Sequence, residues 1–319
     1  MLYIPLLVIG FVPLIYGANL LVDSASSLAK RLKIPVIVIG FTVVAFGTSA
    51  PELIVNIFAS FERSSEITLG NIVGSNIFNI LIILGISAII FPLAIKQNTT
   101  WIEIPLCFLS SLLVILCMND EIMDEKGFSK LTRIDGIVFL FFFLIFLVYT
   151  YNLIKSEKIQ EEIAIKDYSI PKSVLFIVLG LAGLVIGGRL IVISAVEIAR
   201  SFKISERIIG LTIISIGTSL PELATSITAA FKKNTDIAVG NIVGSNIFNV
   251  FFILGLSAII NPVPLQKGSN IDMLVNISAS LLLFLFVFTG KGRKIDRWEG
   301  ILFVLIYVIY LILLIFNVF

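Results

Sequence analysis

Two glutamates, Glu52 and Glu222, lie inside two of the most apolar stretches of this 319-residue chain. Each belongs to a copy of the motif GTS-x-PEL, at residues 47–53 and 217–223, so the two carboxylates are 170 positions apart. An ionisable residue within a membrane-spanning segment is costly and usually marks a functional site. The duplicated pair therefore predicts an ion site built between two halves of the chain.

The proline of each motif predicts a break in its helix beside the glutamate. Pro51 has no backbone N–H, and its ring clashes with the carbonyl four residues earlier. Carbonyls freed around residues 45–48 would be intolerable against lipid but suit a cavity or a bound cation. Thr48 and Ser49 add hydroxyl oxygens on the helix face that carries Glu52. The second copy supplies the matching set Ser215, Thr218, Ser219, Pro221 and Glu222.

Carbonyl, hydroxyl and carboxylate oxygens together are the ligands of hard cations such as Na+ and Ca2+. The alternative is a proline kink whose glutamate is satisfied by neighbouring helices. One copy of the motif would leave these two interpretations balanced. Two copies at symmetric positions favour the cation site.

A second duplicated motif, GNIVGSNIFN, occupies residues 70–79 and 240–249. Its Asn71, Ser75 and Asn79 recur every four residues and form a polar stripe on an otherwise apolar helix. The GxxxG glycines at positions 70 and 74 favour close helix packing, and Asn71 and Asn76 fit hydrogen bonds between helices. The ligand candidates are therefore Ser75 and Asn79, with Ser245 and Asn249 in the second copy.

Composition indicates an all-α polytopic membrane protein, with 58% hydrophobic and 14% charged residues and a mean hydropathy of +1.08. A net charge of +2 does not suggest nucleic acid as a partner, and the absence of histidine removes the usual proton shuttle at neutral pH. Cys107 and Cys117, about 15 Å apart along one helix, are expected to be core residues without a disulfide.

Ten apolar runs predict ten transmembrane helices, five in each half of the chain. They cover residues 2–29, 35–60, 67–92, 101–118, 133–154, 173–199, 205–231, 237–261, 271–289 and 297–318. The first run lacks a basic flank and is expected to be retained rather than cleaved as a signal peptide. The predicted organisation is an N-terminal five-helix repeat at 1–154, a polar linker at 155–172 and a C-terminal five-helix repeat at 173–319.

An odd number of spans per half predicts two repeats of inverted topology, a common plan of transporters whose site lies between the repeats. Lys and Arg number 14 in the loops on one side and 8 on the other, with Arg189 inside a span. This bias places the linker in the cytoplasm and both termini outside. Arg189 occupies the position that Asn19 has in the first half. Its side chain is expected to snorkel to the membrane surface or to form a structural ion pair, rather than to act in transport. The acidic cluster at 120–125 lacks the EF-hand pattern and fits a solvated loop.

The two motifs, duplicated and in this order, resemble the α-repeats of the sodium/calcium exchanger family within the cation/Ca2+ antiporter superfamily. The resemblance covers nearly the whole chain. It implies ten helices in two inverted halves. It also implies a core of helices two, three, seven and eight, across which the long helices one and six slide.

Position by position, the resemblance implies ligands for both ions. Glu52 and Glu222 would be the Ca2+ carboxylates, completed by the backbone carbonyls of Thr48 and Thr218. Flanking Na+ sites would use the Ala45 carbonyl, Thr48, Ser49 and Ser75, and in the second half the Ser215 carbonyl, Thr218, Ser219 and Ser245. Asn79 and Asn249 would line the middle.

Some prokaryotic exchangers have aspartate where this chain has Asn249, so a proton bound there and K+ co-transport are not implied. Ser215 stands where Ala45 stands in the first half, which matters little if only the carbonyl ligates. The large cytosolic regulatory loop of animal exchangers is absent.

The expected function is therefore antiport of Na+, three ions by the resemblance, for Ca2+ by alternating access, with Ca2+ extruded across the plasma membrane. Na+ and Ca2+ would be substrates, and no cofactor or obligate protein partner is indicated. A Ca2+/H+ antiporter on the same fold is the main alternative. A channel fits inverted repeats less well. A membrane-embedded enzyme would need a nucleophile with a base, and neither cysteine lies in the motifs.

Overall fold

The computed structural model describes residues 3–119, 129–156, 166–202, 215–266, 268–290 and 292–316. Within these ranges eight helices are long and apolar enough to cross a membrane, or nine if one bent pair forms a single span. The predicted all-α membrane fold is confirmed, while the count of ten spans stays a prediction. The acidic cluster at 120–125, residues 157–165 of the linker and the start of the span at 205–231 lie outside the described residues.

The first half begins with one long helix and continues through segmented helices, with η denoting π-helical turns. Its elements are α1 (Tyr3–Leu32), α2 (Val36–Ile39), η1 (Gly40–Val44), α3 (Ala45–Thr48), α4 (Ala50–Phe61), α5 (Ser65–Phe78), η2 (Asn79–Leu84), α6 (Gly85–Ile90), β1 (Leu93–Ala94), η3 (Thr99–Glu103), α7 (Ile104–Cys117), β2 (Lys130–Leu131) and α9 (Arg133–Ser156).

The second half repeats this order. Its elements are α10 (Ile170–Ser201), α12 (Ser215–Thr218), α13 (Leu220–Phe231), α14 (Thr235–Phe248), η5 (Asn249–Leu254), α15 (Gly255–Ile260), β3 (Val263–Pro264), α16 (Ser269–Phe286), β4 (Lys294–Ile295) and α17 (Arg297–Ile315). The breaks fall at matching places in the two halves, because the duplicated motifs carry the same proline, glycine and asparagine residues.

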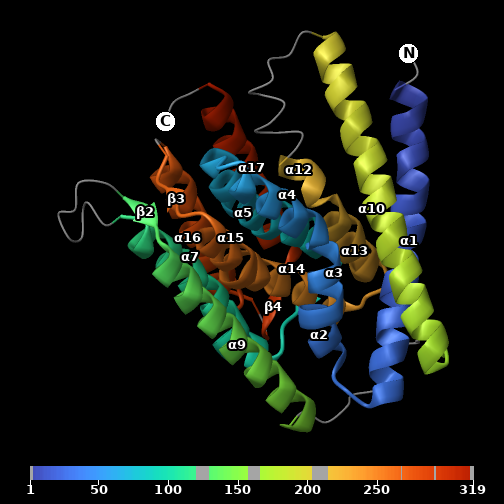
Figure 1. Ribbon diagram of the computed structural model, residues 1–319. Helices are drawn as coiled ribbons and strands as arrows, with labels where there is room; N and C mark the ends of the chain where they lie inside the picture. Colours follow the sequence, from blue (N-terminus) through green and yellow to red (C-terminus); the bar gives the residue numbers. More distant parts are fainter. Residues whose placement is uncertain are drawn as a thin grey trace.

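The long helices α1 and α10 lie side by side along one edge of the molecule (Figure 1). Glycines bring their backbones into direct contact. A Cβ atom added to Gly17 would lie 2.6 Å from the carbonyl oxygen of Gly180, and one added to Gly187 would lie 2.7 Å from that of Gly10. These four glycines occupy matching positions in the two halves, so the crossing is itself nearly symmetric.

The remaining helices of the two halves are interlocked. Gly136 of α9 packs against Gly255 of α15, in the other half, and Gly300 of α17 packs against Gly85 of α6. The short strands are exchanged in the same way, since β1 pairs with β4 and β2 pairs with β3, both antiparallel. Each half therefore completes the packing of the other.

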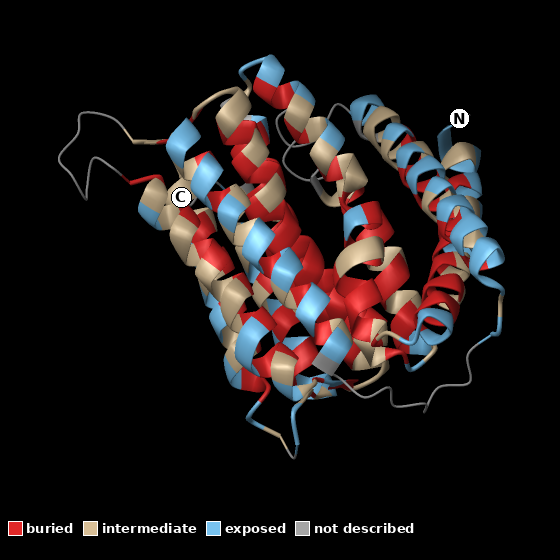
Figure 2. Ribbon diagram, turned by 60° about the horizontal axis from the view of Figure 1, so that its bottom comes forward, coloured by how far each residue is buried: buried red, intermediate tan, exposed pale blue. Residues whose placement is uncertain are grey.

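The buried core is formed by α4 to α6 and α13 to α15, the helices that carry the duplicated motifs. Each membrane-spanning helix has a most apolar window of residues. The buried share of that window is 78% in residues 67–90 and 83% in residues 235–260, but only 22% in α9 and 17% in α17. Figure 2 shows this as a buried centre surrounded by helices with exposed outer faces. Apolar outer faces on α9 and α17 suit contact with lipid tails.

Candidate cation site

Both motif helices are broken beside their glutamates. In the first half α3 ends at Thr48 and α4 begins at Ala50, and the two parts meet at a bend of 48°. The residue between them, Ser49, has φ −83° and ψ 8°, and its counterpart Ser219 has φ −87° and ψ 8°. The predicted helix break is confirmed, and it puts Glu52 and Glu222 in the first turn of α4 and α13.

One detail of the predicted break is wrong. The carbonyl of Ala45 is not freed, because it accepts a hydrogen bond from the Ser49 N–H at 3.0 Å. The tight turn at Ser49 keeps the helical bond to the residue four back. The carbonyl that lacks its helical hydrogen bond is instead that of Gly47. Its donor would be the nitrogen of Pro51, four residues later, which carries no hydrogen.

The two glutamates are buried and are held by serines of the opposite half. Glu52 and Glu222 are each 1% exposed. The Ser219 hydroxyl donates to Glu52 Oε1 at 3.0 Å, and the Ser49 hydroxyl donates to Glu222 Oε1 at 2.8 Å. Carboxylates near helix N-termini are also favoured by the helix dipole. The two halves thus meet at their carboxylates.

Each of these contacts continues to one further serine, which belongs to the second motif. Ser75 Oγ lies 3.0 Å from Ser219 Oγ, and Ser245 Oγ lies 3.0 Å from Ser49 Oγ. All four hydroxyls are fully buried. The predicted ligand candidates from the first and second motifs therefore converge on one polar cluster in the centre of the core.

Asn79 and Asn249 are the first residues of the π-helical turns η2 and η5. Their side-chain amides donate to Asn246 Oδ1 at 2.9 Å and to Asn76 Oδ1 at 3.0 Å. Such turns inside α-helices are frequent at functional sites. The donated bonds fix both side chains, so that their oxygens point in a defined direction.

Asn76 and Asn71 join helices, as the sequence predicts. Asn76 and Asn246 each donate to the other's backbone carbonyl at 3.3 Å. The Thr218 hydroxyl donates to Asn71 Oδ1 at 3.2 Å, and the Thr48 hydroxyl donates to Asn241 Oδ1 at 3.0 Å. The threonines of the first motif are therefore positioned by the asparagines that open the second.

Sequence reasoning missed a supporting pair, Asn56 and Ser226. Asn71 donates to Asn56 Oδ1 at 3.2 Å, and Asn241 donates to Ser226 Oγ at 2.9 Å. Each supporting residue follows its glutamate by four positions, which puts both on one helix face. That spacing is the signal that could have found them.

The buried oxygens without a hydrogen-bond partner among the described residues include one from each glutamate and one from each asparagine of the π-helical turns: Glu52 Oε2, Glu222 Oε2, Asn79 Oδ1 and Asn249 Oδ1. Buried polar atoms are normally paired, because an unpaired one costs the free energy of its lost hydration. Two carboxylate and two amide oxygens at matching positions of the two halves form a donor set suited to a hard cation. No cluster of three or more His, Cys, Asp or Glu side chains occurs among the described residues.

Two predicted residues contribute no side-chain polar contact among the described residues. Ala45 packs against the second motif, since a Cβ atom added to Gly244 would lie 2.9 Å from its own Cβ. Ser215 begins α12, and its side chain lies outside the described residues. Both were predicted to contribute only a carbonyl.

Comparison with known proteins identifies the family of the chain. The sequence pattern of the family described as "Sodium/calcium exchanger protein" matches residues 2–152 and 172–316. The chain belongs to the sodium/calcium exchanger family. The two matched ranges leave out most of the segment predicted as a linker.

Similarity to individual exchangers extends over nearly the whole chain. Identity is 33% to "Sodium/calcium exchanger MaX1" of Methanosarcina acetivorans over 97% of each chain, and 38% to "Putative antiporter CaxA" of Alkalimonas amylolytica over 96% of each. A structure of the sodium-calcium exchanger NCX_Mj soaked with Na+ and Sr2+ is 34% identical and has a TM-score of 0.83, covering 97% of this chain and 98% of that one. Family membership and fold together make this chain a cation/Ca2+ antiporter.

Proposed function

We propose that this exchanger moves Na+ against Ca2+ by alternating access and extrudes Ca2+ from the cytoplasm. The observation that carries the proposal is the set of four buried, unpaired oxygens on Glu52, Glu222, Asn79 and Asn249. A cation among them would replace their missing partners. The names of the related exchangers support Na+ and Ca2+ as the ions.

Ca2+ is bound by the carboxylates of Glu52 and Glu222 and the backbone carbonyls of Thr48 and Thr218. The two carboxylates supply two negative charges, which one Ca2+ neutralises. This balance allows a doubly charged ion to be held in a core that would otherwise exclude it.

Na+ is bound on either side of the Ca2+ position. One set is the Ala45 carbonyl with Thr48, Ser49 and Ser75, and the other is the Ser215 carbonyl with Thr218, Ser219 and Ser245, while Asn79 and Asn249 complete the centre. The Ala45 carbonyl takes part through its second lone pair, since the first accepts the Ser49 N–H. Ser49 and Ser219 already contact the glutamates. A Na+ at either serine therefore changes the position of a Ca2+ carboxylate, so the two ions compete and take turns.

The exchange takes place between two five-helix repeats of opposite orientation, residues 1–154 and 173–319, joined by a cytoplasmic linker at 155–172. Both termini lie outside the plasma membrane. Three Na+ for one Ca2+ would move one net charge per cycle. At about 2.3 kcal/mol per charge and 100 mV, the membrane potential then assists extrusion.

The test is uptake of radioactive Ca2+ into liposomes loaded with Na+ and diluted into Na+-free buffer, beside liposomes that carry only a pH gradient. Na+-driven uptake that is lost in Glu52→Gln supports both the coupling and the site. Glu103→Gln is the matched control, because Glu103 is also fully buried but lies outside the cluster and accepts a hydrogen bond from Tyr149. Uptake driven by the pH gradient alone would replace Na+ by H+ as the coupled ion.

A further inference from the structure

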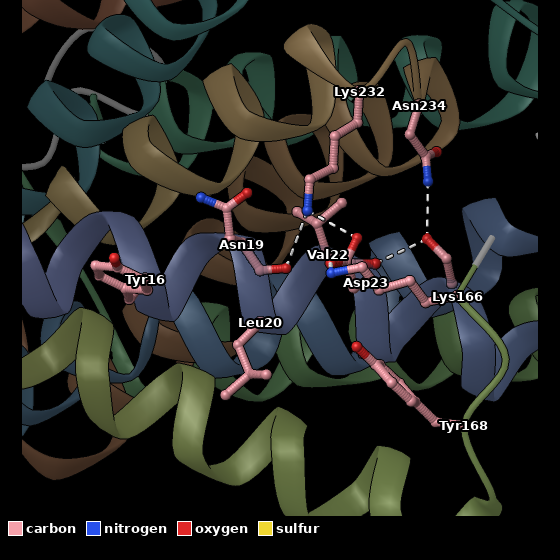
Figure 3. A pocket seen from close by; sticks show the side chains of 10 residues that line it. Tyr16, Asn19, Leu20, Val22, Asp23, Lys166, Tyr168, Lys232 and Asn234 are labelled. Carbon is pink, nitrogen blue, oxygen red and sulfur yellow. Dashed lines mark hydrogen bonds and ion pairs between the residues drawn. The ribbon is translucent and has the colours of Figure 1, made fainter. Parts of the chain in front are cut away.

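One end of α1 is fastened to the core by charged and polar contacts (Figure 3). Lys232, which follows the last turn of α13, donates to Asp23 Oδ1 at 2.7 Å and to the Asn19 carbonyl at 3.2 Å. Asn234 donates to Ser26 Oγ at 2.8 Å. These contacts line a cavity of about 580 Å³ beside α1. They connect a helix at the edge of the molecule to the end of a helix that carries a site glutamate.

The chain segment before α10 joins the same contact. Lys166 lies 2.9 Å from Asp23 Oδ2, and the Tyr168 N–H donates to Ser27 Oγ at 2.8 Å. The hydrogen bond to Asp23 raises the pKa of Lys166. The side chains of Asp23 and Lys232 are only 16% and 29% exposed, so their attraction is less screened than that of a surface pair.

The other half carries a related pair of charges with opposite signs. The residue matching Lys232 is Glu62 at the end of α4. The residue matching Asp23 is Ile193, and the cation of α10 is Arg189, at the position of Asn19 one helical turn earlier. Glu62 and Lys232 have the same backbone conformation, with φ −79° and −82°, and each is followed by a lysine or arginine at φ 57°. The core thus presents a cation to α1 and an anion to α10.

The two arrangements differ in whether the ion pair forms in this structure. Asp23 and Lys232 are paired, whereas among the described residues neither Glu62 nor Arg189 takes part in an ion pair. Both are exposed. Residues 24–29 of α1 are buried, while the described side chains matching 25–28 in α10 are only partly buried. One end of the helix pair is therefore held against the core, and the other is looser.

We propose that Asp23 and Lys232 form an ionic latch that holds α1 against the core in this conformation, and that Glu62 and Arg189 form its charge-reversed counterpart in the opposite conformation. The proposal rests on alternating access, because only a change of conformation would exchange one latch for the other. Since a conformation's population sets the apparent affinity on each side, the two latches act in opposite directions.

The test is hydrogen exchange of the full-length protein in lipid nanodiscs. Asp23→Asn should raise exchange in residues 21–32 and lower it in residues 191–201, by about two- to fivefold for an ion pair of this kind. Arg189→Gln should move both segments the other way. Lys232→Gln should change exchange in the same direction as Asp23→Asn, because either substitution removes the attraction between positions 23 and 232.

Arg31→Gln is the matched control. Arg31 pairs with Asp167 at 2.8 Å at the same end of α1, but this pair does not reach the core. Exchange in the buried turn η2 monitors folding in every variant. Equal exchange in the parent, Asp23→Asn and Arg189→Gln, with η2 still protected, would overturn the latches. Because exchange is read without ion gradients, that result is separate from a failure of Na+-driven transport, which would overturn the proposed function instead.

Discussion

The Ser49 hydroxyl donates a hydrogen bond to Glu222, 173 residues further along the chain, with 2.8 Å between Oγ and Oε1. Ser219 makes the reciprocal contact with Glu52. Each carboxylate is therefore positioned by the half of the chain to which it does not belong. A substitution of either glutamate should therefore alter the structure at the helix breaks of both halves.

Because the glutamates are equivalent, Glu52→Gln and Glu222→Gln should each lower the affinity for Ca2+ more than about tenfold, since ligand charge largely sets Ca2+ affinity. Isothermal titration calorimetry of the purified protein measures this directly. The losses in the two variants should agree within a few-fold. Normal affinity in either variant would remove that glutamate from the site.

Loss of a serine hydroxyl should affect Na+ more than Ca2+. Ser49→Ala and Ser219→Ala each remove one neutral ligand of the proposed Na+ sites and one hydrogen bond. The Na+ concentration for half-maximal exchange should therefore rise about fivefold, as for roughly 1 kcal/mol. Ser111→Ala is the control, because Ser111 is equally buried but bonds to Asn276 on α16. A larger effect on Ca2+ than on Na+ would place these serines in the Ca2+ site alone.

Asn249→Asp should make transport depend more steeply on pH. The substitution adds a third carboxylate to the proposed site of Glu52 and Glu222, and three like charges in one buried site favour uptake of a proton. Na+-driven Ca2+ uptake should then fall faster on acidification than in the parent chain. Asn79→Asp, at the matching position, should behave alike, and pH profiles unchanged from the parent in both variants would separate these amides from the ion site.

The close crossing of α1 and α10 should not tolerate a methyl group. Gly17→Ala would place its Cβ 2.6 Å from the carbonyl of Gly180, which cannot retreat without moving the helix. Overpacking of this kind costs about 1–3 kcal/mol, so the melting temperature in detergent should fall. Gly70→Ala is the control, with no described atom within 4 Å of its added Cβ. An equal melting temperature in both variants would contradict the close contact.

The helices and their breaks were predictable from the sequence, because apolar runs and prolines act locally. Which oxygens meet was predictable only through the repeat, since Ser49 and Glu222 share no local pattern. The engaged carbonyl of Ala45 was not predictable, because a proline removes one hydrogen bond without specifying how the turn before it rearranges. The strand pairs were also missed, since two-residue strands such as β1 leave no periodic signal.

The exchanged strands and outer helices bear on how the protein is made. Gly85 and β1 pack against Gly300 and β4, which lie in the other half and are synthesised much later. The first half can enter the bilayer as it leaves the ribosome, but its packing stays incomplete until the second half has been made. A chain cut between the halves would therefore leave the face of α6 at Gly85 without its partner helix.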